Sequence, residues 1–223
     1  MTFKQIYARA INRKGEQALT ASLPRVISRQ ALISATDNTY LSEMTKCVFR
    51  SGFVWKVVEN KWPNFETAFA GFNPKAVANF SDERLAFLAQ DTSIIRYMTK
   101  ISATRENAKF ILDVISEHKT FGQFLAAWPD DDIVGLLLYL KKHGSRLGGH
   151  TGQYFLRFVG KDTFIFSKDV VTVLIAEGIV DKEPTSQRAL RATQEAFNHW
   201  RAETGLPYSH LSRIMAASVG TSF

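Results

Sequence analysis

The chain has 223 residues, of which 45% are hydrophobic and 22% charged, proportions that are ordinary for a folded globular protein. Its single cysteine, Cys47, excludes an internal disulfide and fits the cytoplasmic location that we expect. No apolar run approaches the roughly 20 residues of a membrane helix, and we recognise no signal peptide. The formal net charge of +7 favours a polyanionic partner such as nucleic acid, although charge alone does not identify it.

Helical patterns dominate the first half of the chain. Apolar spacing and capping residues predict helices over Ile6–Leu19, Leu41–Val58, Arg84–Gln90 and Ile101–Glu117. The proline-containing stretch Lys61–Asn64 interrupts this pattern.

Helical patterns also dominate the second half of the chain. Helices are predicted over Ile133–Lys142, Phe155–Val159, Val170–Glu177, Ser186–Glu203 and Leu211–Val219. The run Thr163–Phe166 resembles a strand but is too short to found a sheet. We therefore predict an all-α fold. It would be a single domain over residues 1–223, or two lobes, with about 41–140 as one and the N-terminal segment plus 141–223 as the other.

The segment Leu140–Gly152 joins two predicted helices and carries four glycines within nine residues. Glycine permits positive φ angles and close backbone approach. The N–H groups that begin a helix attract anions such as phosphate. We therefore predict a hairpin that holds a nucleic-acid backbone without reading its sequence. The alternative is an ordinary corner between helices. The predicted phosphate contacts come from Lys142, Arg146, Gly148, Gly149, His150 and Thr151.

Four segments, in this order, resemble the helix–hairpin–helix DNA glycosylase superfamily, specifically its branch related to 3-methyladenine DNA glycosylase I. They are Ser51–Trp55, Phe69–Ala78, Ile94–Ala108 and the hairpin. The resemblance covers roughly Leu41–Val173 and implies a helical glycosylase-like fold. It also implies that the helix with Trp55 lines a base pocket and that the hairpin holds the DNA backbone.

The resemblance implies a monofunctional base-excision repair glycosylase that flips a damaged base and hydrolyses its N-glycosidic bond. Alkylated purines such as 3-methyladenine are the expected lesions. The alternative is a non-catalytic relative that retains the clamp and the pocket without excision. In either case we expect a monomer that binds double-stranded DNA and needs no cofactor.

The chain departs from this family at three places. Enterobacterial-type members bind zinc through two cysteines and two histidines, and one cysteine cannot supply that site, so we expect no metal. Cys47 occupies the place of the base-recognising glutamate, eight residues before Trp55. Ser167 occupies the place of the superfamily's catalytic aspartate, and Asp169 follows two residues later.

Trp55 is the first candidate to stack an extruded base, because an indole ring attracts a cationic purine. The alternative is a core tryptophan. Phe53 and Tyr40 are companion candidates for the pocket, again with a core role as the alternative. Cys47 either contacts the base or is a buried structural thiol.

Two carboxylates are candidates for catalysis. Asp169 could stabilise positive charge on the sugar and polarise water, or it could simply complement the dipole of the helix that it begins. Glu43 lies one turn before Cys47 on the same helix face, where it either replaces the missing glutamate or is a surface acid.

Overall fold

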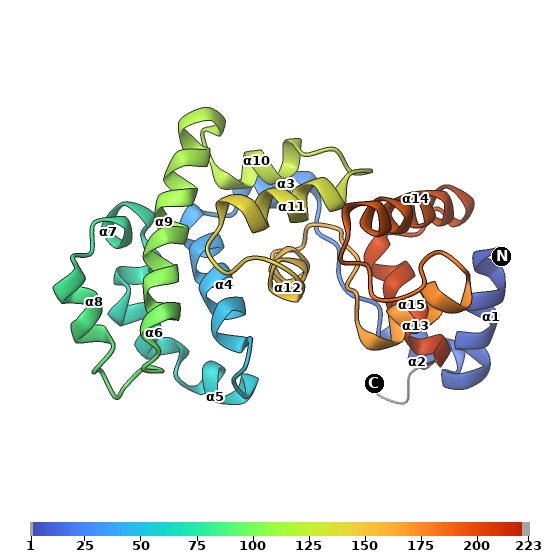
Figure 1. Ribbon diagram of the computed structural model, residues 1–223, viewed down its shortest axis with the longest axis horizontal. Coiled ribbons are helices and arrows are strands. Elements are labelled where there is room, and N and C mark those ends of the chain that lie inside the picture. Colours follow the sequence, from blue (N-terminus) through green and yellow to red (C-terminus); the bar gives the residue numbers. More distant parts are fainter. Residues whose placement is uncertain (1, 220–223) are drawn as a thin grey trace. The chain divides into compact units, whose positions relative to one another are not determined.

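The computed structural model describes residues 2–219, in which helices are joined by loops and no β-strand occurs (Figure 1). The predicted all-α fold is therefore confirmed. The elements in chain order are α1 (Phe3–Lys14), α2 (Glu16–Ala21), α3 (Arg29–Ser34), α4 (Asp37–Arg50), α5 (Trp55–Asn60), α6 (Trp62–Ala68), the 3₁₀ turn η1 (Ala70–Phe72), α7 (Pro74–Ala78), α8 (Asp82–Leu88), α9 (Met98–His118), α10 (Phe121–Ala127), α11 (Ile133–His143), α12 (His150–Phe158), α13 (Lys168–Ala176), α14 (Gln187–Thr204) and α15 (Tyr208–Val219).

The chain divides into two compact units, each made of separate stretches of sequence. The first, which we call the hairpin unit, comprises Ser28–Trp128 and Leu136–Lys161. The second, the terminal unit, comprises Met1–Ile27, Pro129–Gly135 and Asp162–Phe223. The assignment of the whole chain to one domain or to two lobes stays a prediction.

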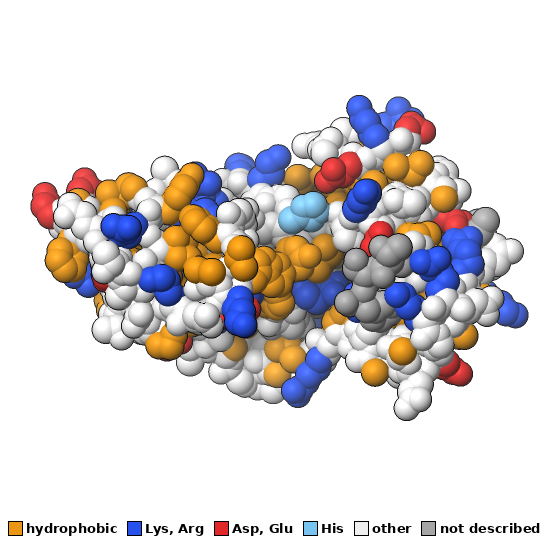
Figure 2. Space-filling view, turned by 90° about the horizontal axis from the view of Figure 1, so that it is seen from below, with side chains coloured by type: hydrophobic (Ala, Val, Ile, Leu, Met, Phe, Trp, Pro, Cys, Tyr) orange, Lys and Arg blue, Asp and Glu red, His pale blue; other side chains and the backbone are white. Residues whose placement is uncertain are grey.

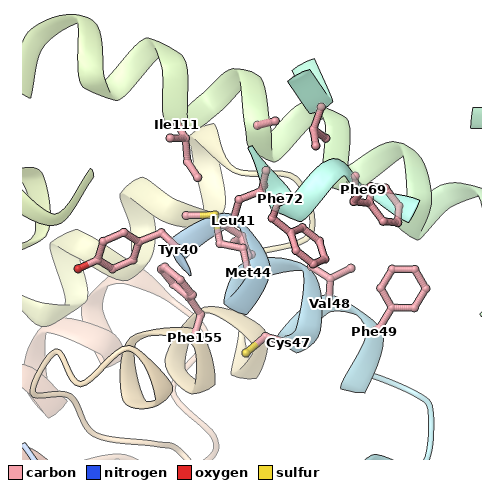
Figure 3. Packing of buried hydrophobic residues seen from close by; sticks show 14 of the residues in the cluster. Tyr40, Leu41, Met44, Cys47, Val48, Phe49, Phe69, Phe72, Ile111 and Phe155 are labelled. Carbon is pink, nitrogen blue, oxygen red and sulfur yellow. The ribbon is translucent and has the colours of Figure 1, made fainter. Parts of the chain in front are cut away.

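Helix α4 lies at the centre of the hairpin unit and packs against both α9 and α12. Its apolar residues recur at helical spacing, so the helix buries side chains toward several neighbours at once. Figure 3 shows Tyr40, Leu41 and Met44 of α4 between Ile111 of α9 and Phe155 of α12. This packing fixes the position of α4, and with it the turn that follows Arg50.

Four aromatic rings tile the next part of this core, and neighbouring rings lie nearly parallel. The ring of Trp62 stacks on Phe65 and on Phe72, with centroids 5.1 and 5.3 Å apart. The rings of Phe69 and Phe72 are separated by 5.6 Å. Ala70, Gly71 and Phe72 have φ angles of 50°, 61° and 54°. This left-handed turn allows the ring of Phe72 to pack against those of Trp62 and Phe69. The segment Phe69–Ala78 is thus part of the framework.

The terminal unit contains α1, α2, α13, α14 and α15. The ring of Phe164 lies 4.4 Å from that of Phe197 on α14 and 5.8 Å from that of Tyr208 on α15. Both oxygens of the Asp162 carboxylate accept hydrogen bonds from the backbone N–H groups of Tyr208 and Ser209. The strand-like run that includes Phe164 is therefore a loop whose apolar residues contribute to a helical core.

Glycines shift two predicted helix boundaries. The prediction of one helix over Leu41–Val58 is wrong, because α4 ends at Arg50 and the chain turns at Gly52, where φ is 89°. In the same way Gly15, with φ of 76°, separates α1 from α2 within the predicted Ile6–Leu19 helix. Such φ angles suit glycine and interrupt a helix.

Several predicted helix starts are confirmed by side-chain caps. The hydroxyls of Ser81, Ser167 and Ser186 accept hydrogen bonds from backbone N–H groups three residues later, at the beginnings of α8, α13 and α14. The proline stretch at Lys61–Asn64 does more than interrupt a pattern, because α6 begins there with Pro63 in its first turn. Between residues 2 and 219, no helix has both the length and the apolar character that crossing a membrane requires.

Candidate base pocket and nucleic-acid interface

A cavity of about 120 Å³ opens on the surface of the hairpin unit, where α4, α5 and α12 meet. It is lined by Cys47, Arg50, Ser51, Trp55, His150, Thr151, Tyr154 and Phe158. The cavity brings together two predicted pocket residues, Trp55 and Cys47, and two predicted phosphate contacts, His150 and Thr151. In the left part of Figure 2, which shows the hairpin unit, hydrophobic side chains are exposed beside lysine and arginine side chains.

Three aromatic side chains form one wall of the cavity. The ring of Trp55 lies edge-to-face with Tyr154 at 5.4 Å and with Phe158 at 5.9 Å. Trp55 and Phe158 are 41% and 42% exposed, whereas Trp62 and Trp200 are buried in cores. Large exposed aromatics at a concave site are what a planar ligand needs for stacking.

Arg50 completes this wall. Its guanidinium carbon lies 4.7 Å from the ring centroid of Phe158 and 5.1 Å from that of Trp55. Two carboxylates hold the guanidinium there, because Nη1 donates to Glu43 and Nη2 donates to Glu59, each at 3.2 Å. Only 12% of the Arg50 side chain is exposed, so the cation is largely removed from water.

Cys47 carries a neutral thiol at the back of the cavity. Burial and the adjacent Glu43 carboxylate raise the pKa of this thiol well above its ordinary value. Its Sγ donates to Oε1 of Glu43 at 3.8 Å. Glu43 therefore contacts two residues that line the cavity, Cys47 and Arg50, and brings a carboxylate close behind the lining.

Lys100 fixes the end of α4, from which Arg50 and Ser51 project. Its buried ammonium group, on α9, donates to the backbone carbonyls of Phe49 and Ser51. Burial lowers the pKa of Lys100, and the nearby Arg146 lowers it further. The lysine thus closes the carbonyl end of α4 as a cation at a helix C-terminus does.

The hairpin between α11 and α12 is tight. A Cβ at Gly152 would lie 2.4 Å from the carbonyl oxygen of Leu147, so only glycine fits this approach. Leu147 is buried, whereas Arg146 and Gly149 are exposed and have φ angles of 60° and 57°. Nη2 of Arg146 donates to Oγ1 of Thr99 on α9.

The predicted phosphate contacts surround the beginning of α12. Lys142 is exposed in the last turn of α11, Gly149 is the N-cap of α12, and His150 and Thr151 are the first two residues of that helix. Gly148, which precedes the N-cap, is partly exposed. Exposed N–H groups and cationic side chains at one helix N-terminus favour binding of a phosphate.

Other predicted site residues do not line the cavity. Tyr40 is buried in the core, where its hydroxyl donates to the carbonyl oxygen of Leu32 at 2.6 Å. Phe53 packs against Tyr97, with ring centroids 5.9 Å apart, and its ring lies 4.6 Å from Nζ of Lys100. Asp169 is half-buried in the first turn of α13, in the terminal unit.

Four residues that line the cavity were not among the predicted site residues: Arg50, Ser51, Tyr154 and Phe158. Arg50 lies three residues after Cys47 and could have been found as its neighbour on one helix face. Tyr154 and Phe158 are four residues apart on α12 and lie on one face for the same reason. Among residues 2–219, no group of three or more His, Cys, Asp or Glu side chains could hold a metal ion.

Sequence comparisons find a match between part of this chain and a known family. Residues 33–135 match the family described as methyladenine glycosylase. DNA-3-methyladenine glycosylase 1 of Escherichia coli strain K12 is 33% identical over 95 residues, which are 42% of this chain and 50% of that protein. The match therefore spans half the length of this curated relative. The family match ends at residue 135 and leaves out the hairpin and α12.

Structural comparisons extend over more of the chain. The 3-methyladenine DNA glycosylase I of Staphylococcus aureus matches with a TM-score of 0.53 and 18% identity, over 68% of this chain and 92% of that one. The 8-oxoguanine DNA glycosylase of Methanocaldococcus jannaschii matches with a TM-score of 0.56 and 15% identity, over 94% and 89%. That of Thermotoga maritima matches with a TM-score of 0.54 and 12% identity, over 99% and 98%. The chain thus has the fold of the helical DNA glycosylases, and its residues 33–135 match the methyladenine glycosylase family.

Proposed function

We propose that the protein is a monofunctional DNA glycosylase of base-excision repair. It would hydrolyse the N-glycosidic bond of an alkylated purine, such as 3-methyladenine, after the base has been flipped out of the duplex. One observation carries this proposal. The aromatic cavity and the phosphate-binding end of the hairpin share the first residues of α12, His150 and Thr151, so a strand held by the hairpin has its bases next to the cavity.

The walls of the cavity suit a flat, positively charged base. Trp55, Tyr154 and Phe158 present aromatic surface, and the face of an indole attracts a cation. Glu43, behind Cys47 and Arg50, supplies negative charge near the same place. Alkylation at a purine ring nitrogen gives the base a positive charge and makes it a good leaving group. Modest catalysis would therefore suffice.

We propose two candidates for the catalytic carboxylate, Asp169 and Glu43. Asp169 would stabilise positive charge that develops on the sugar and would polarise the attacking water. Glu43 would do so from the hairpin unit, where its Oε1 already contacts the Cys47 thiol and the Arg50 guanidinium.

The second candidate function is a DNA-binding protein that does not excise bases. The replacements at Cys47 and Ser167 favour it, because a thiol with a raised pKa and a capping hydroxyl both lack the charge of a carboxylate. Under either function the proposed partner is double-stranded DNA with a damaged base. We propose that a monomer binds it and that the protein is cytoplasmic.

Base release from alkylated DNA tests the proposal. The protein is incubated with DNA treated with a methylating agent, and free methylated purines and abasic sites are measured. We expect release of 3-methyladenine, and we expect Trp55→Ala to reduce it at least tenfold. Phe87→Ala, which removes an exposed ring on α8 away from the cavity, is the matched control. Salt-sensitive DNA binding without any base release would instead support the non-catalytic function.

A further inference from the structure

The aromatic corner of the cavity holds a flat cation that belongs to the protein itself. The guanidinium of Arg50 lies against Trp55 and Phe158, whose ring planes meet at 74°. A guanidinium is planar, delocalised and positively charged. These are the properties of the N-alkylated purine that the proposed function assigns to this cavity.

Arg50 and a cationic base would compete for the same surfaces. The face of an aromatic ring offers one region of negative potential, and two cations that approach it together repel each other. At the same time Arg50 neutralises Glu43 and Glu59, which are 20% and 51% exposed. If the guanidinium moves away, both carboxylates lose their partner and can attract another cation.

Within residues 2–219, one buried donor of the Arg50 side chain is unpaired, and this favours movement of the side chain out of the cavity. Among the described residues, the buried Nε–H of Arg50 has no hydrogen-bond partner, although both terminal nitrogens are paired. A buried donor without an acceptor opposes the conformation that buries it. Outside the cavity, water or a DNA phosphate would satisfy all of the donors on this side chain.

We propose that Arg50 is the resting occupant of the base site and a specificity-determining residue, because its guanidinium must be displaced from Trp55 and Phe158 before a base can stack there. This inference rests on the proposed function only in taking a nucleobase as the ligand of the cavity. A cationic alkylated base regains the contacts with the two aromatic rings and with Glu43 that the arginine gives up. A neutral base regains only part of this interaction energy.

Direct binding of the 3,9-dimethyladeninium cation, in which a methyl group takes the place of the deoxyribose and keeps the positive charge, tests this inference without DNA. Arg50→Gln removes the competing cation, so we expect about tenfold tighter binding than in the unchanged protein, measured by calorimetry and by tryptophan fluorescence. Tenfold corresponds to about 1.4 kcal/mol. Arg84→Gln is the matched control, because Arg84 lies against the rings of Phe80 and Phe87 at 5.6 and 5.3 Å in the same unit. It should leave base binding unchanged.

Equal or weaker binding by folded Arg50→Gln would overturn the inference and would make Arg50 a brace between α4 and α5. A second measurement needs no variant. The Nε–H resonance of Arg50 should be shifted by the ring currents of Trp55 and Phe158, and binding of the 3,9-dimethyladeninium cation should remove that shift. A resonance that stays shifted while the base binds would equally refute displacement.

These results also separate the two proposals. If the unchanged protein releases methylated bases but Arg50 stays on the rings, only the displacement is wrong. If the unchanged protein neither releases a methylated base nor binds one, and Arg50→Gln does not bind one either, the proposed function fails as well.

Discussion

Asn107 and Ser145 are joined by two reciprocal hydrogen bonds. Nδ2 of Asn107, on α9, donates to the Ser145 carbonyl oxygen at 3.1 Å, and the Ser145 backbone N–H donates to Oδ1 of Asn107 at 2.7 Å. The side-chain amide of Asn107 thus pairs with the Ser145 backbone as a peptide group of a neighbouring segment would. It fixes the position of the first half of the hairpin. The contact gives a physical reason for an asparagine in the segment Ile94–Ala108.

Replacing Asn107 by alanine should loosen the hairpin. The variant loses both bonds and leaves the N–H and C=O groups of Ser145 without these partners, which should cost about 2 kcal/mol of unfolding free energy. Affinity for duplex DNA should fall as well, because the predicted phosphate contacts follow Ser145 directly in the chain. Chemical denaturation and fluorescence anisotropy measure the two effects. Asn79→Ala, at an exposed position of the same unit, should change neither, and an unaltered Asn107→Ala protein would contradict the bracing role.

Lys100→Met should destabilise the hairpin unit although it removes a costly buried charge. The carbonyls of Phe49 and Ser51 would lose their donor at the end of α4, with an expected loss of about 1–3 kcal/mol. A thermal or urea melt measures this loss. Lys109→Met removes an exposed lysine of α9 that pairs with Glu106, and it should shift the melt by less than about 0.5 kcal/mol. Equal stabilities of the two variants would show that Lys100 does not close α4.

Tyr40 should make stability fall at alkaline pH. Burial, with a smaller effect of Asp37, raises the pKa of its hydroxyl to about 12 in the folded protein. Since this folded-state pKa exceeds the unfolded value of about 10, the stabilisation is complete below pH 10 and is lost as the pH rises toward 12. Between pH 8 and 11 the protein should lose about 1.4 kcal/mol more than Tyr40→Phe does. Parallel pH profiles of the two proteins, from urea unfolding, would refute this linkage.

The two candidate carboxylates should give different kinetic signatures. Asp169→Asn should lower single-turnover base release about 100-fold while DNA binding is retained, because it removes charge stabilisation in the transition state. Glu43→Gln should mainly weaken binding of the 3,9-dimethyladeninium cation, since it removes negative charge beside the cavity. Asp181→Asn, an exposed carboxylate of the terminal unit, is the control. If neither Asp169→Asn nor Glu43→Gln differs from that control, neither side chain acts in excision.

Local chemistry explains which parts of the fold could be predicted. Serine caps and helical spacing located α8, α9, α13 and α14, because these signals lie within a few residues of each helix end. Gly15 and Gly52 were harder, since glycine breaks a helix only where the rest of the fold requires a positive φ. A pattern of apolar residues that continued on both sides concealed both turns.

The candidate site was partly predictable for the same reason. Trp55 and Cys47 could be singled out from one stretch of sequence, and the structure places both at the cavity. Tyr154 and Phe158 reach it only because α12 packs on α4, a contact between distant segments that periodicity does not reveal. Tyr40 has the residue type of a pocket aromatic, but its place on α4 turns it inward toward Leu32.

The division of the chain also limits how this protein can be dissected. The hairpin unit is interrupted by Pro129–Gly135, which belongs to the terminal unit, and α11 begins in one unit and continues in the other. A single cut therefore releases neither unit as an intact polypeptide. A gene fragment limited to residues 33–135, the portion shared with the family, would encode Trp55 but not Tyr154 or Phe158. Such a fragment would carry one side of the cavity without the helix that closes it.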